Sequence, residues 1–502
     1  MQIIVTPGQM RQMEQNFFRE TGTPSSQLML RAAEELVHAM DERGLVRGRR
    51  IAFVSGNGGN GGDGLAAAEI CSRMGALCQV ALAMPAESFT GDARLYLDAL
   101  PANVPLRSLA EIDEPDVWVD AIFGIGLSRN VEGYPAECIG RMNASDAVVV
   151  SVDVPSGLDS RTGDILGCAV HADLTVTFQH PKIGHFLRRG MDACGELVVR
   201  DIGVAPEFLT DTPPLTAETP FLRRPQDSDI AALLPKRRHF SHKGTHGHLL
   251  LVAGSRGMAG AAAIAARAAV HSGAGLTTIA CPQEVVPILQ ILVPEAMCIP
   301  LPQNTAGAVS DEALPILKNA LKSKSAVAIG PGLSRSAAPE IIRSVLECGL
   351  PAVIDADALN LIAADEALKQ LLRDHHLITP HPGEAARLVP LSGDEITDAL
   401  ALRRLGCQVI YKGAASLIAA ADRLFLSDTG SPCMAKGGSG DMLTGIAGAL
   451  LARGMTAANA AIAASHIHGR AGEAAEDKHG LAYPAAMDLI ACLPDVWRAL
   501  AQ

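Results

Sequence analysis

The chain repeats one pattern twice: short runs rich in Val and Ile alternate with segments of helical periodicity. Continuous apolar runs of this length are typical of parallel strands that are buried on both faces. In the first half the pattern predicts a helix over 65–74 and strands over 51–55, 79–84, 117–120 and 147–153. This alternation favours an α/β fold, in which helices cover both faces of a mostly parallel sheet.

The same pattern restarts after a break. Residues 206–225 are rich in Pro, Thr and acidic residues and therefore predict a linker. Beyond it we expect helices over 259–271, 444–453 and 457–473 and strands over 247–253, 326–329, 352–355, 377–379 and 408–411. A length of 502 residues fits two domains with separate cores. We predict two three-layer α/β/α domains, 1–220 and 225–502, with ligands beyond the carboxyl ends of the strands.

Composition and charge narrow the class of protein. The formal net charge is −12, which on average repels nucleic acid. Eleven cysteines without a Cys-x-x-Cys pair favour a reducing compartment over a disulfide framework. The first residues lack the features of a signal peptide, and Gly, Pro or charge interrupts every apolar stretch before membrane-spanning length. We expect a cytoplasmic protein that binds neither nucleic acid nor membrane.

A glycine-rich segment follows the first predicted strand. Residues 56–64 contain six glycines and the pattern Gly-x-Gly-x-x-Gly, but no acid ends the next strand to hold a ribose, and Asp63 would repel a pyrophosphate. Asn60 and Asp63 add oxygen donors that suit a cation. Asp120 and Asp153 end two further strands. A turn or helix cap would explain any one of these acids, whereas their convergence at one sheet edge predicts a ligand site.

A second glycine run, Lys436-Gly-Gly-Ser-Gly-Asp441, precedes a helix predicted to begin near Asp441. Free N–H groups at such a helix start can hold a transferring phosphoryl group, and Asp441 is placed to take the proton from an attacking hydroxyl. The alternative is a turn in which Asp441 only caps the helix. Four more polar segments follow predicted strands, at 330–334, 355–360, 379–384 and 412–416. Together they predict a phosphoryl-transfer site, with 355–360 suited to position Mg²⁺ through water.

The first half resembles the NAD(P)H-hydrate epimerase family over about residues 1–215, through the motifs at 56–64, 119–126 and 153–157. The resemblance implies K⁺ bound by Asn60, Asp120 and Ser156. It also implies substrate contacts from Gly59, Asn60, Gly61, Gly62, Asp63, Gly124, Ile125, Gly126, Leu127, Ser128, Arg129, Asn130 and Asp153. Gly59 stands where Asn is common in the family, a change that keeps the main-chain donors. Inversion at the hydroxylated C6 needs proton transfer, for which Asp153 is our candidate acid/base.

The segment 225–502 is similar to the ADP-dependent NAD(P)H-hydrate dehydratases of ribokinase-like fold, through motifs at 242–248, 272–276, 330–332, 355–360, 379–384 and 437–441. This resemblance implies contacts to the hydrated nicotinamide from Ala261, Gly332, His381 and Asp441. It places the adenine nucleotide on Lys412, Gly413, Ala414, Ala415, Ser416 and Gly440. The first domain is expected to be Rossmann-like.

Together the two resemblances predict a homo-oligomeric repair enzyme. One domain would equilibrate the R and S hydrates, and the other would dehydrate the S form while ADP is converted to AMP and phosphate, with Asp441 and Asp153 as the catalytic residues. Two alternatives stay open: the second domain as a conventional small-molecule kinase, and the first as a non-catalytic nucleotide-binding module.

Overall fold

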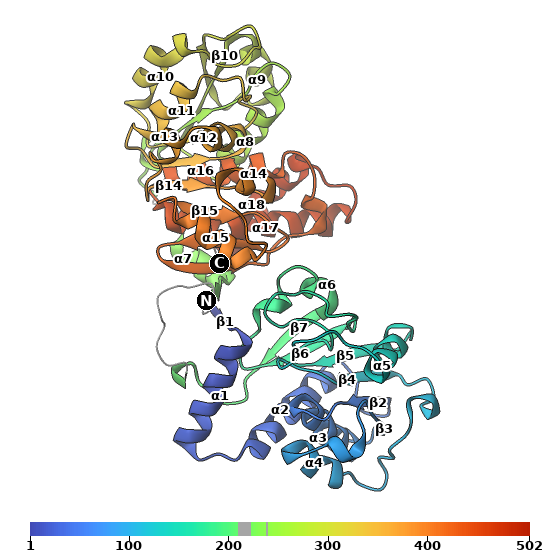
Figure 1. The fold of residues 1–502 in the computed structure, drawn as a ribbon. Coiled ribbons are helices and arrows are strands. Elements are labelled where there is room, and N and C mark those ends of the chain that lie inside the picture. The colour runs from blue at the N-terminus through green and yellow to red at the C-terminus, as the bar shows by residue number, and fades with distance from the viewer. Residues whose placement is uncertain (209–221, 237–238, 502) are drawn as a thin grey trace. The chain divides into compact units, whose positions relative to one another are not determined.

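The computed structural model describes residues 1–208, 222–236 and 239–501 (Figure 1). It divides into two compact units, Ile3–Pro214 and Leu215–Gln502, the second of which also includes Met1–Gln2. The predicted linker falls largely on 209–221, outside the described residues. In the described part of the chain, no helix combines the length and apolar character needed to cross a membrane.

The first unit is built on a parallel sheet with strand order β3-β2-β4-β5-β6-β7. Its strands are β2 (Arg50–Ser55), β3 (Leu77–Leu82), β4 (Val117–Ala121), β5 (Val148–Val152), β6 (Leu174–Phe178) and β7 (Glu196–Arg200). The order reverses between β2 and β4, so that the loops after these two strands diverge and open a crevice at the carboxyl edge. The predicted Rossmann-like unit is thus a doubly wound sheet of the flavodoxin-like order, and both predicted motifs follow the strands at its switch point.

Helices cover both faces of this sheet. The helices are α1 (Pro7–Thr21), α2 (Ser25–Asp41), α3 (Gly59–Arg73), α4 (Gly91–Asp98), α5 (Tyr134–Asn143) and α6 (Gly190–Cys194), preceded in the chain by β1 (Gln2–Ile4). Ile51 and Phe53 of β2 belong to the core shared with α1, α2 and α3. The alternate residues Ala52 and Val54 belong to the core shared with α5. The alternation of side chains along β2 therefore serves two apolar layers, as the continuous apolar run predicts.

One helix boundary in this unit differs from the prediction. The helix predicted over 65–74 begins at Gly59, inside the glycine-rich segment. Glycine weakens a helix by about 1 kcal/mol relative to alanine, so propensity alone argues against this start. Close packing requires it: a Cβ on Gly61 would lie 1.7 Å from the carbonyl oxygen of Gly56, and one on Gly64 would lie 2.4 Å from the Cβ of Ala121.

The second unit contains a larger sheet with strand order β8-β17-β16-β15-β14-β13-β12-β9-β10-β11. The strands are β8 (Leu222–Arg224), β9 (His248–Val252), β10 (Leu276–Pro282), β11 (Met297–Leu301), β12 (Ala326–Ile329), β13 (Ala352–Ile354), β14 (His376–Ile378), β15 (Gln408–Tyr411), β16 (Ser416–Ala420) and β17 (Arg423–Ser427). Pairing is parallel from β11 to β15, and β16 and β17 form an antiparallel extension.

The helices of this unit cover the sheet on both faces and confirm the predicted α/β class. They are α7 (Asp227–Leu233), α8 (Ala259–His271), α9 (Val286–Leu292), α10 (Leu314–Leu321), α11 (Pro339–Leu346), α12 (Ala356–Ala364), α13 (Glu366–Lys369), α14 (Pro382–Leu388), α15 (Glu395–Arg403), α16 (Ser439–Ala452), α17 (Ala457–His479) and α18 (Ala486–Leu500). Leu249 and Leu251 pack in one core with α8, α16, α17 and α18. Their neighbours Leu250 and Val252 are fully buried as well.

Candidate active sites

The first unit carries a cavity of about 670 Å³ at the switch point. Ten predicted contact residues line it: Gly59, Asn60, Asp63, Gly124, Ile125, Gly126, Leu127, Ser128, Arg129 and Asp153. Three others, Gly61, Gly62 and Asn130, are not among its lining residues. Gly61 and Gly62 are buried in the packing of α3 instead, where a Cβ on Gly62 would lie 2.4 Å from Met29 Sδ.

A buried ion pair fixes the charge of Asp153. This residue follows β5 in the left-handed region, with φ of 62°, which short polar side chains tolerate better than others. Lys182 Nζ lies 2.5 Å from Asp153 Oδ1, and Thr177 Oγ1 donates to the same oxygen at 2.8 Å. Burial alone raises the pKa of Asp153, but the charge and hydrogen bond of Lys182 outweigh it, and the pKa lies below its ordinary value. Asp153 is therefore a carboxylate that can accept a proton.

Two more acids of the same cavity have pKa shifts of the opposite sign. Burial raises the pKa of Asp63 well above its ordinary value, and the carboxylates of Asp153 and Glu14 add to the shift. Burial likewise raises the pKa of Glu14, to about 6, in spite of the Lys182 charge. An ionised carboxylate beside carboxyl groups of raised pKa is the arrangement that acid and base chemistry requires.

Lys182 and Glu14 were not predicted from the sequence. Lys182 follows the carboxyl end of β6, as the motifs follow theirs, but the segment Leu174-Thr-Val-Thr-Phe178 was not predicted as a strand. Glu14 lies on α1, far from every motif.

The three predicted K⁺ ligands lie together around the main chain of Phe123. Asn60 Nδ2 donates to the Phe123 carbonyl at 3.0 Å, and the Phe123 N–H donates to Ser156 Oγ at 2.8 Å. Ser156 Oγ donates in turn to Asp120 Oδ1 at 2.5 Å. Asp120 is fully buried, and burial raises its pKa while hydrogen bonds from Ser156 and Ser151 oppose the rise. All of these donors are neutral, so the Asp120 charge is hydrogen-bonded but not neutralised by them.

This donor set consists of one carboxylate and neutral oxygen groups. Within the described residues, no group of three or more His, Cys, Asp or Glu side chains is placed to hold a metal ion. A cation near Asp120 would therefore depend on amide, hydroxyl and main-chain oxygens, which are hard ligands of the kind that alkali and alkaline-earth ions prefer.

In the second unit, Asp441 lies on the first turn of α16, which begins at Ser439, close to the start near Asp441 that the glycine run predicts. Gly438 caps this helix with φ of 93°. A Cβ on Gly440 would lie 3.4 Å from Lys412 Nζ and 3.7 Å from Asp355 Oδ2. The helix start therefore lies beside two strand ends, those of β15 and β13.

Lys412 and Asp355 form the centre of this site. Lys412 Nζ lies 2.8 Å from Asp355 Oδ1 and 3.7 Å from Glu384 Oε2. Thr444 Oγ1 donates to Asp355 Oδ2 at 2.7 Å. Burial raises the pKa of Asp441 to about 7, together with the carboxylates of Asp355, Asp357 and Glu384 and against the charge of Lys412. A base with a pKa near neutrality is well matched to proton transfer at cellular pH.

The other predicted residues of the second site fall into three places. Ala261 and Gly332 are neighbours, since a Cβ on Gly332 would lie 3.1 Å from the Cβ of Ala261. His381 caps α14. Its ring nitrogen Nδ1 accepts from the Gly383 N–H at 3.0 Å, and the main-chain N–H of His381 donates to Glu384 Oε2 at 2.9 Å. Gly413, Ala414 and Ala415 connect β15 to β16, which Ser416 begins.

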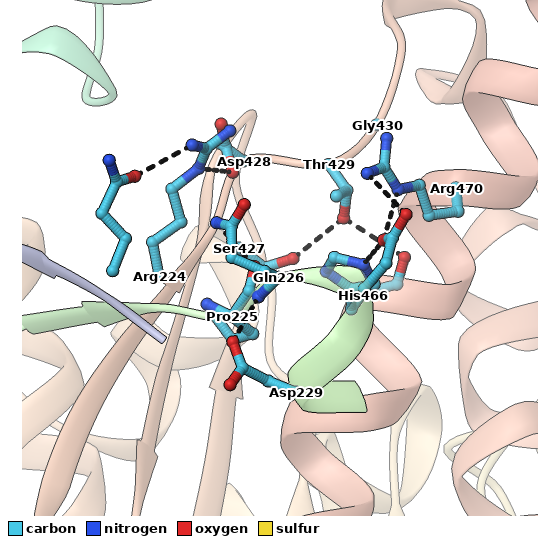
Figure 2. A network of polar contacts seen from close by, with 12 residues as sticks. Arg224, Pro225, Gln226, Asp229, Ser427, Asp428, Thr429, Gly430, His466 and Arg470 are labelled. Carbon is cyan, nitrogen blue, oxygen red and sulfur yellow. Dashed lines mark hydrogen bonds and ion pairs between the residues drawn. The ribbon is translucent and has the colours of Figure 1, made fainter. Parts of the chain in front are cut away.

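His468 of α17 is a further residue that the sequence did not reveal. Its Nε2 lies 3.1 Å from Ser439 Oγ in the glycine run, and burial lowers its pKa to about 4, so the ring is neutral. Figure 2 shows the polar network that fixes this part of α17. His466 Nε2 lies 2.6 Å from Asp227 Oδ1, and Thr429 Oγ1 donates to the His466 carbonyl at 3.2 Å.

Comparisons with known proteins identify relatives of both units. The family model for NAD(P)H-hydrate dehydratase matches residues 249–495, and the model for the YjeF-related protein N-terminus matches residues 25–184. A bifunctional NAD(P)H-hydrate repair enzyme of Moorella thermoacetica is 37% identical over 99% of this chain and 97% of its own length. A protein of the same name from Coxiella burnetii is 36% identical over 96% of both chains.

Solved structures support the fold of the second unit. A ribokinase-like superfamily protein from Enterococcus faecalis is 25% identical, with a TM-score of 0.50, and the match covers 56% of this chain and 97% of that one. A hypothetical protein from Streptococcus mutans matches with the same identity and TM-score over 56% of this chain and 100% of that one.

Proposed function

The chain belongs to the family of bifunctional NAD(P)H-hydrate repair enzymes, and from this premise we propose a division of work between its two units. The first unit interconverts the R and S hydrates of NADH and NADPH. The second unit dehydrates the S form with ADP as the phosphoryl donor. The observation that carries this division is that each unit places a buried aspartate–lysine pair and a second carboxyl group at the carboxyl edge of its own sheet.

In the first unit Asp153 is the proposed base at C6 of the hydrated ring, because Lys182 keeps it ionised. The cavity residues named above would hold the rest of the dinucleotide. K⁺ would be held by Asn60, Asp120 and Ser156, and the Phe123 carbonyl joins this set. A K⁺ ion bound there would balance the negative charge of Asp120, which its neutral hydrogen-bond donors leave uncompensated.

In the second unit Asp441 is the proposed base. It takes the proton of the C6 hydroxyl while the hydroxyl oxygen attacks the β-phosphate of ADP, and the bond from that phosphorus to the bridging oxygen breaks to release AMP. The lone pair of the ring nitrogen then expels the phosphorylated oxygen as phosphate, and loss of a ring proton restores NADH. Ala261, Gly332 and His381 are the proposed contacts of the ring. Lys412 through Ser416 and Gly440 are those of the nucleotide.

The 355–360 segment fits Mg²⁺ through water rather than by direct ligation. Both oxygens of Asp355 are engaged, one by Lys412 and the other by Thr444. Asp357 Oδ2 accepts from the Ser334 N–H, and Asn360 Oδ1 accepts from Arg387. The carboxyl groups of Asp355, Glu384 and Asp441 interact with the charge of Lys412, and that of Asp357 interacts with Asp441. The ion would supply the positive charge that this acidic site needs to accept an anionic nucleotide.

A mixture of R and S hydrates tests both activities. With ADP, we expect the NADH absorbance to appear from both epimers; without ADP, we expect interconversion alone. A stable phosphorylated product with no NADH would instead establish a small-molecule kinase. In the Asp153→Ala variant the S form should be consumed at the normal rate while the R form remains, apart from spontaneous epimerisation. R-form consumption at the wild-type rate would reject the role of Asp153 and favour a non-catalytic first unit.

We also propose that the protein works in the cytoplasm, since all eleven cysteines are free thiols. A homo-oligomer stays an expectation from the family.

A further inference from the structure

One helix of the epimerase cavity lies outside the part of the chain that the family model matches. The match begins at residue 25, whereas α1 ends at Thr21. Nevertheless, Met10, Arg11, Glu14 and Phe18 of α1 line the cavity together with Asp153 and the glycine-rich segment. Met10 and Phe17 are buried and lie four and three residues from Glu14, so Glu14 occupies the inward face of the helix. An ionised carboxyl group at such a position costs stability, which suggests that the site uses it.

Two contacts, one just before α1 and one in its first half, hold this helix at the site. Val5, just before α1, pairs with Lys182: its N–H donates to the Pro181 carbonyl at 3.0 Å, and its carbonyl accepts from the Ile183 N–H at 3.2 Å. Thr6 then caps α1 by accepting from the Gln9 N–H at 3.1 Å. Further along, Arg11 Nη2 donates to the Ile125 carbonyl at 3.0 Å. Glu14 is therefore held between the strand-end lysine and the predicted substrate loop.

Charged groups of both signs influence the protonation of Glu14. Glu14 interacts with Lys182 and Arg11, which favour its ionised form, and with Asp153 and Asp63, which oppose it. Among the described residues, Lys182 forms its ion pair with Asp153. Burial and the repulsion among these carboxyl groups raise the pKa values of Glu14 and Asp63, whereas the ion pair with Lys182 keeps Asp153 ionised.

We propose that Glu14 is a second catalytic residue of the epimerase site, the proton donor to the C6 hydroxyl. The inference rests on the proposed epimerase activity. Glu14 gives its proton to the hydroxyl as the C6–O bond breaks, and the oxygen leaves as water while the lone pair of the ring nitrogen forms a double bond to C6. A second water adds to C6 from the opposite side, its proton passes to Asp153, and the electron pair returns to nitrogen. In the reverse direction the two carboxyl groups exchange roles.

The decisive experiment measures interconversion of the R and S hydrates by the full chain without ADP. We expect Glu14→Gln to lower the rate by ~10²-fold or more, the loss typical of a removed general acid. Glu20→Gln, an exposed position on the same helix, is the matched control and should leave the rate unchanged. Glu14→Asp keeps a carboxyl group and should retain part of the rate. All three variants should dehydrate the S form with ADP at the wild-type rate.

Two further readouts separate a catalytic from a structural role. The wild-type rate should fall as pH rises above about 6, where Glu14 loses its proton, and this fall should disappear in Glu14→Gln but persist in Asp63→Asn. In water enriched in heavy oxygen, each inversion should bring one heavy oxygen onto C6. A wild-type rate in Glu14→Gln, loss of the pH dependence in Asp63→Asn instead, or inversion without exchange would each overturn the proposal.

The failure of the proposed function has a different signature: a wild-type chain that interconverts the hydrates no faster than buffer does. If Glu14→Gln does not fold, the Glu14→Asp variant decides. An epimerisation rate and a pH dependence in Glu14→Asp that both equal those of the wild type, with inversion that brings no heavy oxygen onto C6, would reject the donor role.

Discussion

The two units use the same set of groups in opposite ways. Each buries a lysine beside an aspartate, Lys182 with Asp153 and Lys412 with Asp355, and each leaves another carboxyl group nearby with a raised pKa. In the first unit the proposed base is the aspartate that the lysine pairs with. In the second unit it is Asp441, which Lys412 influences only from a distance. In the first unit the lysine keeps the proposed base ionised, whereas in the second it only opposes the rise in the pKa of the proposed base.

The largest expected effect comes from removing the base that has no paired lysine. Asp441→Asn keeps the shape of the α16 start but removes the proton acceptor, and we expect dehydration of the S hydrate to fall by about 10³-fold. Recovery of NADH absorbance from purified S hydrate and ADP measures it. Epimerisation should be unaffected. Asp495→Asn, an exposed position on α18, serves as the control. A loss below tenfold would mean that Asp441 only caps the helix.

Replacing Lys182 or Lys412 should change the pH profile of the half-reaction in its own unit. Without Lys182, burial of Asp153 is unopposed and its pKa rises, so Lys182→Met should lower epimerisation at neutral pH by about 10²-fold and restore part of it at higher pH. Lys412→Met should raise the pKa of Asp441 and move the dehydration profile toward higher pH. Rates of each half-reaction against pH measure both effects. A uniform loss without a shift of the profile would mean that the lysine only holds the fold together.

How far the sequence led can be judged from particular elements. The helix α8 and the strands β12 and β15 have their predicted bounds, and the polar motifs do follow the carboxyl ends of strands. The start of α3 was placed too late because its first turns are built of glycines, which propensity places outside a helix and which close packing, such as that of Gly61 against Gly56, requires here. Glu14 was not predicted, because long-range contacts, the pairing of Val5 with Lys182 and the hydrogen bond from Arg11 to Ile125, bring α1 to the site.

A smaller effect concerns stability. Burial raises the pKa of Glu14 from 4.5 to about 6, so the native state holds this proton more tightly than the unfolded chain. Its contribution is therefore fully present below about pH 4.5 and is lost as pH rises to about 6. Above that pH, Glu14→Gln should stabilise the first unit by up to ~2 kcal/mol, and below pH 4.5 it should change nothing.

Fluorescence can follow the first unit by itself. The chain has two tryptophans, and in a Trp497→Phe background the remaining Trp118, fully buried in the first unit, reports its unfolding. Glu20→Gln is again the control. If Glu14→Gln destabilises the unit at neutral pH, the carboxylate is a structural partner and not a group that the fold tolerates for catalysis.

The rates of the two half-reactions should depend on pH in opposite directions. Dehydration needs Asp441 without its proton, so its rate should rise tenfold per pH unit up to about 7 and then level off. Epimerisation needs Glu14 with its proton, so its rate should be level up to about pH 6 and fall tenfold per unit above it. Conversion of R hydrate to NADH should then be limited by dehydration in mild acid and by epimerisation in mild base. Initial rates of the two half-reactions on one preparation test this, with Asp441→Asn and Glu14→Gln each flattening only its own profile. Profiles that slope in the same direction would show that the lysine pairs do not divide the roles of the carboxyl groups as the two sites imply.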